Sequence, residues 1–411
     1  MKRVAVTGLG CVTPIGNDAG AFWESLVAGR HGFAEITRFD PSGMKARIAA
    51  EVKGFDPTAY MPGGEVRKTD LYAQYAVAAS VQAVEDSGFT GANDPERTGV
   101  YIGSGIGGMD TFLSQAETLK VKGPGRVSPF FIPMMISNMA SAQVAIRYNA
   151  KGPCLPVVSA CSTSTHAIGE AFRAIKHGYA DVIIAGGAEA AINPLSVSGF
   201  ANCLALSTSD DPDSCSIPFD KRRDGFVIGE GAGILVLEEY GRAAERGANI
   251  YCEICGYGNT NDAFHITSPH PGAEGAIKMM EQAVSESGIL PDEKLYVNMH
   301  GTGTPPNDKT ETIAIKAVFG ELAYRMPLSS TKSMTGHMLG AAGGAEAVAA
   351  VMAIKTGIVP PTIGLREPDP ECDLDYMPNK MRECGVNKAM SVSMGFGGHN
   401  AGVIFIKDGE V

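Results

Sequence analysis

Four residues of this sequence stand in polar or glycine-rich turns and carry side chains that could do chemistry: Cys161, His300, Lys332 and His337. Cys161 stands where an apolar run, 157–160, gives way to apolar residues at helical spacing. A thiol at a helix N-terminus faces unpaired N–H groups and the positive end of the helix dipole, which lower its pKa. Its location alone favours a nucleophile and a small buried thiol equally, because free cysteines are commonly buried. A nucleophile would need partners.

Two segments supply candidate partners for the thiol. His300 ends a predicted strand, 295–299, and a turn of Gly, Thr and Pro residues follows it. Lys332 and His337 lead into a predicted helix, 340–355, which is built almost wholly of small residues and can therefore be buried. A lysine and a histidine that lead into a buried helix are costly unless they are paired, and this favours a functional role over surface decoration.

These residues suit a particular kind of reaction. A cysteine with one histidine is typical of a papain-type dyad, in which the histidine deprotonates the thiol. Here two histidines and a lysine stand in polar turns, and the glycine-rich loop 395–400 adds backbone N–H donors. Two neutral imidazoles could both donate hydrogen bonds to one developing oxyanion or enolate. This set favours carbon–carbon bond formation on thioesters over peptide hydrolysis.

Other motifs favour structural roles. The glycine-rich turn 103–108 matches G-x-G-x-x-G after a predicted strand, but a dinucleotide fingerprint needs a helix at once, and we expect the chain to run into a loop at 122–126. Cys252 and Cys255 form a C-x-x-C without a second pair at zinc-finger spacing, so structural thiols are expected. His166, on the helix after Cys161, is expected to be structural.

Charge and composition exclude several classes of protein. The 411 residues carry a net charge of −11, which argues against nucleic-acid or anionic-membrane binding by a basic face. Local basic groups remain that could bind an acidic partner: Arg67 and Lys68, Arg126, and 221–223. No stretch reads as apolar enough to span a bilayer, so a cytoplasmic protein is expected. Nine cysteines at scattered positions do not indicate a disulfide framework.

Short apolar runs alternate with helical patterns from end to end, which predicts an α/β fold of two interlocked halves without a linker. Strands are predicted at 4–7, 99–102, 157–160, 182–185, 234–238, 251–257, 295–299, around Asp375 and at 389–393. Helices are predicted at 71–86, 140–147, 165–177, 275–287, 310–319 and 340–355. Both halves begin with a strand and end with adjacent apolar strands, a coarse sign of duplication.

At this point the chain resembles the β-ketoacyl-acyl-carrier-protein synthases, the condensing enzymes of fatty-acid synthesis, and most closely the type called synthase II. The resemblance covers essentially the whole chain through five ordered motifs: Ser159-Ala-Cys161-Ser, Asp220-Lys-Arg-Arg-Asp-Gly-Phe226, His300-Gly-Thr-Gly-Thr-Pro305, Lys332-Ser-Met-Thr-Gly-His337 and Gly395-Phe-Gly-Gly398. It implies a thiolase-like fold of two similar α/β halves in five layers, and a homodimer. The halves would be 1–250, with the nucleophile, and 251–411, with the two histidines and the lysine.

The resemblance also implies roles for single residues. Cys161 matches the acylated nucleophile, His300 and His337 match the pair that stabilises the enolate of decarboxylated malonyl thioester, and Lys332 matches the lysine that orders that site. The N–H groups of Cys161 and Phe396 match an oxyanion hole, and Phe396 also matches a gate. Further matches extend to a supporting network (Asp308, Glu311, Thr302, Thr304) and an acyl pocket (Ile106, Phe200). The candidates for the basic patch on which a carrier would dock are Arg67, Lys68 and Arg126.

The implied reaction is a decarboxylative condensation without a cofactor. An acyl chain moves from an acidic acyl carrier protein to Cys161, and malonyl-carrier protein then loses CO2 and attacks the thioester. Asn298 and Glu346 match a monovalent-cation site of some relatives. Four positions depart from the usual pattern: Met394 for a Phe, Val392 for an Asn, Leu204 for an Arg implicated in carrier contact, and Cys154 for an Asn.

Alternative functions remain open on the sequence. A polyketide ketosynthase subunit would share every catalytic motif. A non-catalytic chain-length partner would keep the fold but lack the nucleophile, and Cys161 argues against it. A thiolase would carry a second cysteine as acid and base, and the loop 395–400 contains none.

Overall fold

The computed structural model describes residues 1–89 and 94–410, in which nine strands form one mixed sheet in the order β4-β5-β6-β1-β7-β13-β12-β8-β9. These strands are β1 (Val4–Val12), β4 (Thr98–Gly103), β5 (Val182–Glu189), β6 (Gly231–Glu239), β7 (Cys252–Asn261), β8 (Leu295–Asn298), β9 (Leu328–Ser329), β12 (Lys388–Gly395) and β13 (His399–Ile406). Two short antiparallel pairs lie outside it: β2 (Ala34–Glu35) with β3 (Ile48–Ala49), and β10 (Ile358–Val359) with β11 (Arg382–Glu383).

Helices cover the outer faces of the two parts of the sheet, and further helices lie between these two parts. They are α1 (Ala19–Val27), α2 (Gly63–Val66), α3 (Leu71–Ser87), α4 (Met109–Lys122), α5 (Phe131–Met135), α6 (Met139–Tyr148), α7 (Thr163–Lys176), α8 (Pro194–Asn202), α9 (Tyr240–Glu245), α10 (Glu274–Ser287), α11 (Pro305–Phe319), α12 (Lys332–Thr335) and α13 (Ala342–Thr356). Strands before residue 250 form the β4-β5-β6-β1 part of the sheet, and strands after it form the rest.

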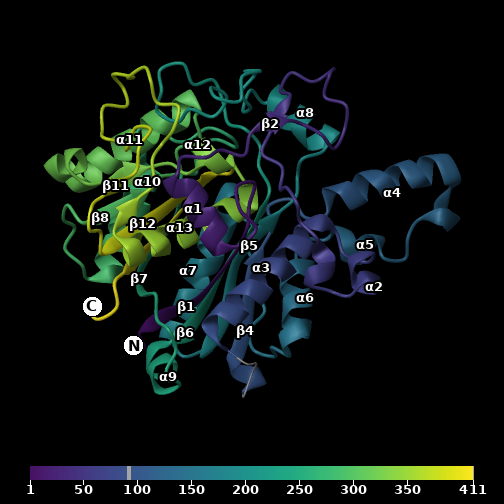
Figure 1. Ribbon diagram of the computed structural model, residues 1–411, viewed down its shortest axis with the longest axis horizontal. Coiled ribbons are helices and arrows are strands. Elements are labelled where there is room, and N and C mark those ends of the chain that lie inside the picture. Colours follow the sequence, from purple (N-terminus) through teal and green to yellow (C-terminus); the bar gives the residue numbers. More distant parts are fainter. Residues whose placement is uncertain (90–93, 411) are drawn as a thin grey trace.

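The arrangement has five layers, as the α/β and thiolase-like prediction requires. Helix α3 packs on β1, β5 and β6, and α10 packs on β7 and β13. Helices α7 and α13 pack against each other and against strands from both parts of the sheet, so they form the middle layer (Figure 1). The fold class is confirmed. The division at residues 250 and 251 stays a prediction, because β1 and β7 pair directly and join the two parts.

The two parts of the sheet share one packing detail, which explains a glycine in β1 and a glycine in β7. A Cβ on Gly10 of β1 would lie 1.9 Å from the carbonyl oxygen of Ala79 in α3. A Cβ on Gly258 of β7 would lie 1.8 Å from the carbonyl oxygen of Met279 in α10. Each glycine therefore lets an outer helix approach its strand closely, and the coarse duplication of the sequence has a counterpart in packing.

Helix α13 is enclosed on all sides. A Cβ on Gly343 would lie 2.0 Å from Thr165 Oγ1 of α7, and one on Gly344 would lie 2.2 Å from the carbonyl oxygen of Gly233 in β6. The segment Leu339–Thr356 is long and apolar enough to cross a membrane, contrary to the sequence reading, but 83% of it is buried inside the protein. A core helix explains that composition.

Two predicted strands do not form, and one helix was not predicted. Residues 157–160 do not form a strand, because Ala160 takes a positive φ of 51° and the chain turns into the short 3-10 helix η4 (Ala160–Ser162). No strand forms around Asp375, whose carboxylate instead accepts the N–H of Met377 in a turn. Helix α4 was not predicted, since Thr111 is its one fully buried residue and an exposed helix shows no apolar stripe.

Candidate active site

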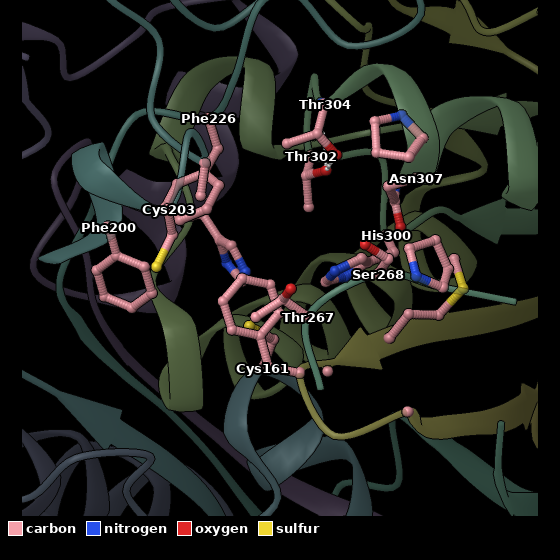
Figure 2. A pocket seen from close by; sticks show the side chains of 18 of the residues that line it. Cys161, Phe200, Cys203, Phe226, Thr267, Ser268, His300, Thr302, Thr304 and Asn307 are labelled. Atoms are coloured by element: carbon pink, nitrogen blue, oxygen red, sulfur yellow. Dashed lines mark hydrogen bonds between the residues drawn. The ribbon is translucent and has the colours of Figure 1, made fainter. Parts of the chain in front are cut away.

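Cys161 lies in η4, directly before α7, with 8% of its surface exposed. It lines a cavity of about 180 Å³ together with His300, His337 and Phe396 (Figure 2). A Cβ on Gly395 would lie 2.7 Å from the carbonyl oxygen of Ser159 and 3.2 Å from the Cys161 nitrogen. The glycine-rich loop therefore comes from the far end of the chain to touch the turn that holds the thiol.

Burial controls the titration of the Cys161 thiol. Burial raises its pKa to about 12, while the positive charge of Lys332 and a hydrogen bond from the Phe396 N–H act in the opposite direction. The expectation that the helix end lowers this pKa below its usual value is therefore wrong for the resting site. The thiol is protonated near neutral pH and has to lose its proton during acyl transfer.

The Phe396 N–H lies close enough to the Cys161 thiol to favour its ionised form, so this donor is beside the position where an oxyanion would form on a Cys161 thioester. Phe396 follows β12, and its ring centroid lies 6.4 Å from that of Phe200. Ile106, Phe200 and Phe396 pack in the apolar cluster that contains Cys161. The predicted acyl-pocket and gate residues therefore meet at the nucleophile, and Phe200 lines the cavity itself.

His300 and His337 face each other, with ring centroids 5.3 Å apart and planes at 85°. His337 Nδ1 accepts the Leu339 N–H at 3.3 Å, so in the neutral ring the proton lies on Nε2. Burial, and then the charge of Lys332, lower the pKa of both histidines well below the usual value. Both rings are therefore neutral at physiological pH, which is the form predicted for two donors to one oxyanion.

Lys332 is buried with 1% exposure and forms an ion pair with Glu346 of α13. Its ammonium group is the positive charge that acts on Cys161, His300 and His337 alike. A buried lysine keeps its charge only if a partner compensates its lost hydration, and Glu346 supplies that partner.

The segment after His300 is held by two buried carboxylates. Glu311 accepts the N–H groups of His300 at 2.6 Å and Gly301 at 2.8 Å, and burial raises its pKa to about 8. Asp308 accepts the N–H of Gly303 at 3.2 Å and lies 3.3 Å from Arg223 Nε. The predicted supporting acids therefore fix the backbone around the histidine rather than reach the cavity.

Hydroxyl groups line the outer part of the cavity. Thr302 and Thr304 share a hydrogen bond of 2.9 Å between their Oγ1 atoms and lie above His300 in Figure 2. Three lining residues that the sequence reading missed are Thr267, Ser268 and Asn307. They stand in irregular segments or at a helix start without a periodic pattern, so no local signal singled them out.

The four residues that differ from the usual pattern of the family lie in different parts of the structure. Met394 lines the cavity and Val392 is fully buried in β12. Leu204 lines the cavity too and is 82% exposed, with a left-handed φ of 58°. Cys154 is exposed in a bridge to Val100 at the edge of the sheet.

Four buried polar atoms of three residues at the predicted cation site have no hydrogen-bond partner. Asn298 Oδ1 and Nδ2, Glu346 Oε2 and Ser391 Oγ are buried without a partner, and Asn298 and Ser391 are neighbours in the parallel β8–β12 register. Their oxygen atoms fit a monovalent cation or a water molecule. No cluster of three His, Cys, Asp or Glu residues suited to a metal ion occurs in the described part of the chain.

The basic residues predicted for carrier docking do not line the cavity. Arg67, Lys68 and Arg126 are exposed, next to α2 and α4. Within 221–223, Arg223 is buried and binds Asp308 and Asp369, so it is not free for a partner. The remaining sequence motifs have structural roles as expected: His166 bridges Ser159 and Asn259 by hydrogen bonds of 2.6 and 3.0 Å.

The neutral state of the two histidines makes the stability of the fold depend on pH. In the unfolded chain each histidine takes up a proton below about pH 6.5, while in the folded chain it stays neutral. Each histidine should therefore lower the unfolding free energy as the pH drops from 7 to 5, by up to about 1.4 kcal/mol per pH unit, while Glu311, whose pKa burial raises to about 8, acts in the opposite direction. Urea unfolding at several pH values measures the sum. The double variant His300→Asn, His337→Asn should remove the histidine contribution, so its unfolding free energy should fall less with decreasing pH than that of the wild type, and an unchanged slope would contradict the assignment.

Comparison with known proteins places this site in a family. A model of the β-ketoacyl synthase N-terminal domain matches residues 1–243, and one of the C-terminal domain matches residues 251–366. A curated protein of Synechocystis sp. named 3-oxoacyl-(acyl-carrier-protein) synthase 2 is 52% identical over 408 residues, which cover 99% of this chain and 98% of that protein. A protein of the same name from Staphylococcus aureus is 49% identical over 407 residues, with coverage of 99% and 98%.

Comparison with solved structures gives the same result as comparison with the curated sequences. A β-ketoacyl synthase from Burkholderia phymatum has a TM-score of 0.91 at 35% identity and covers 99% of this chain and 100% of its own. A type II polyketide ketosynthase, solved with its acyl-carrier protein, has a TM-score of 0.91 at 33% identity, with 99% of both chains covered. Models for both domains and relatives alike along their whole lengths lead to one conclusion: this chain belongs to the β-ketoacyl synthase family.

Proposed function

We propose that this chain is a 3-oxoacyl-(acyl-carrier-protein) synthase, which elongates fatty acids by decarboxylative condensation of malonyl-carrier protein with an acyl group on Cys161. One observation carries the chemistry: two neutral histidines face each other in the cavity that the cysteine lines. Curated relatives with this activity in their names are 49–52% identical over almost the whole chain, while the polyketide ketosynthase with its carrier is 33% identical. This difference supports fatty-acid over polyketide substrates.

The first half-reaction loads the enzyme. The sulfur of Cys161 attacks the carbonyl carbon of the acyl-carrier thioester, and the oxyanion is stabilised by the backbone N–H groups of Cys161 and Phe396. When the carbonyl re-forms, the carbon–sulfur bond to the carrier breaks. The thiol proton leaves Cys161 in this step and ends on the carrier's thiol. The protonated resting state of Cys161 makes that proton transfer part of the loading step.

The second half-reaction makes the carbon–carbon bond. Malonyl thioester loses CO2, and the electron pair of the broken bond becomes an enolate. His300 and His337 donate hydrogen bonds to the enolate oxygen, and the neutral rings give no proton away. The enolate carbon then attacks the Cys161 thioester. Collapse of that intermediate releases the Cys161 sulfur and a product two carbons longer.

The test follows the two half-reactions separately. Wild-type protein should elongate saturated acyl-carrier substrates by one malonyl unit, and elongation of polyketide intermediates alone would exclude the fatty-acid function.

Cys161→Ala should abolish condensation yet retain malonyl decarboxylation. His300→Ala or His337→Ala should lose decarboxylation by about 2–4 kcal/mol in activation free energy, since each removes one oxyanion donor. Mass spectrometry measures acyl-Cys161 and released CO2 measures decarboxylation. Normal decarboxylation in either histidine variant would refute the assigned role.

A monovalent cation would sit beside this site without taking part in bond making. Asn298 Oδ1, Glu346 Oε2 and Ser391 Oγ, which have no hydrogen-bond partner in the protein, would hold it.

The carrier protein would dock on a basic surface near α2, α4 and α5. Arg67, Lys68 and Arg126 are exposed, and Lys68 Nζ lies 5.0 Å from the centre of the Phe130 ring, near α5. Figure 1 shows α2, α4 and α5 on the same side of the molecule. These positive charges complement an acidic carrier, despite the net charge of −11. Leu204 at the mouth would contribute an apolar contact in place of a charge.

Charge reversal tests the docking surface. Lys68→Glu and Arg126→Glu should raise KM for acyl-carrier protein about 10-fold or more at low salt, because electrostatic steering is lost. The rate with a small acyl-pantetheine thioester should not change. Lys380→Glu, an exposed site in the other part of the chain, is the matched control. Equal effects on carrier and small thioester would place these residues outside the docking surface.

The chain would act as a homodimer through the sheet edge beside β4. There the segment 152–155 pairs with β4: the Val100 N–H donates to the Pro153 carbonyl at 3.0 Å, and the Leu155 N–H donates to the Val100 carbonyl at 3.1 Å. Large apolar side chains are exposed along this edge and on the neighbouring helices: Phe112 42%, Leu119 50%, Val121 66%, Ile132 53%, Ile146 78%, Leu155 46% and Val158 53%. So many exposed apolar groups indicate an interface, because monomers seldom carry large apolar patches.

Sedimentation equilibrium measures the assembly. Wild-type protein should sediment with twice the mass of the chain, and Leu155→Glu with Val158→Glu should shift it toward the monomer, because each buries a charge in the interface. Leu290→Glu, at an exposed leucine elsewhere, is the control and should leave the mass unchanged. A monomeric wild-type protein would overturn the proposal.

A further inference from the structure

Glu189, at the end of β5, is a fully buried carboxylate that the mechanism above does not use. It accepts four hydrogen bonds. Oε1 accepts from Ser104 Oγ at 2.8 Å and from the Ile106 N–H at 3.2 Å. Oε2 accepts from the N–H groups of Gly105 at 2.8 Å and Gly340 at 3.0 Å. This carboxylate therefore joins two turns that are far apart in the sequence.

The three backbone N–H donors favour the ionised form of Glu189. A proton on Oε2 would meet two N–H groups and find no acceptor, and a proton on Oε1 would find one only in the Ser104 hydroxyl. Burial raises the pKa of this carboxyl group, and the hydrogen bonds oppose that effect. Neither Gly105 nor Gly340 can carry a side chain, because a Cβ on either would lie 2.7 Å from Glu189 Oε2.

The first turn belongs to the glycine-rich motif 103–108, which resembled a dinucleotide fingerprint. Its N–H groups bind a carboxylate of the chain itself, and α4 follows at Met109. The side chain of Ile106 packs in the apolar cluster of Cys161. Glu189 thus fixes one wall of the space beside the nucleophile.

The second turn is η6 (Leu339–Ala341), which follows His337. Glu189 holds the Gly340 N–H, and the adjacent Leu339 N–H donates to His337 Nδ1. Leu339 has a positive φ of 49°, a conformation that needs outside support in a residue other than glycine. The bond to Glu189 gives that support and so keeps the His337 Nε2–H aimed at the cavity.

We propose that Glu189 is a positioning residue with two outputs: it orients His337 through η6 and places Ile106 at the acyl site through the turn 104–107. The proposal rests on the proposed function and adds a residue to it. Glu189→Gln tests it, because an amide keeps the shape but offers one acceptor oxygen, and its NH2 group would face at least one backbone N–H in either orientation.

The Glu189→Gln substitution should lower the rate of malonyl decarboxylation and leave the rate of acyl loading nearly unchanged. Acyl loading of Cys161 with a short acyl group should stay within about 3-fold of wild type, while malonyl decarboxylation should fall about 10-fold or more, because only the latter needs His337 as a donor. Glu189→Asp keeps two acceptor oxygens and should recover part of the decarboxylation rate. Glu230→Gln, which alters a buried carboxylate bound to Arg38 and Tyr75, is the control and should leave both rates within about 3-fold.

Ser104→Ala tests the other output and covers the case in which Glu189→Gln does not fold. It removes one donor on the Ile106 side only, so the preferred acyl chain length should shift while decarboxylation stays unchanged. Equal losses of loading and decarboxylation in folded Glu189→Gln, or no loss in either, would overturn the His337 output. An unchanged chain-length profile in Ser104→Ala would overturn the Ile106 output. An inactive wild-type protein would instead refute the proposed function.

Discussion

The active site depends on one buried positive charge. Lys332 lies in the middle of the protein, where its charge adds to the effect of burial in keeping two histidines neutral and opposes the effect of burial on the Cys161 thiol. Such a charge is stable only with a partner, and Glu346 of α13 supplies it. The position of α13 between the two parts of the sheet therefore decides where the chemistry can take place.

The same layer explains why the functional groups come from distant parts of the chain. Cys161 lies before α7, Lys332 and His337 lie before α13, and these helices pack against each other. The loop at Gly395 reaches the thiol because glycine leaves room for the Ser159 carbonyl.

The sequence predicted the fold class correctly, and the four candidate residues Cys161, His300, Lys332 and His337 lie close together in the structure, both for physical reasons. Apolar periodicity marks buried elements, and a lysine and histidine before a helix of small residues can hardly be surface features. The errors lie where tertiary context decides. The strand predicted at 157–160 fails because Ala160 turns the chain into η4, and α4 escaped notice because it is exposed. Glu189 carries no periodic or spacing signal, since its four partners are mostly backbone groups that only the folded chain brings together.

The tight enclosure of α13 limits how this protein can evolve. At Gly343 and Gly344 a single added methyl group would collide with α7 or β6, so mutations in the middle layer are removed by selection before they can alter activity. Substitution should cost less at the rim of the cavity, where Leu204 is 82% exposed. New acyl preferences or carrier partners in this lineage should therefore arise from drift in the loops, while the reaction itself stays fixed.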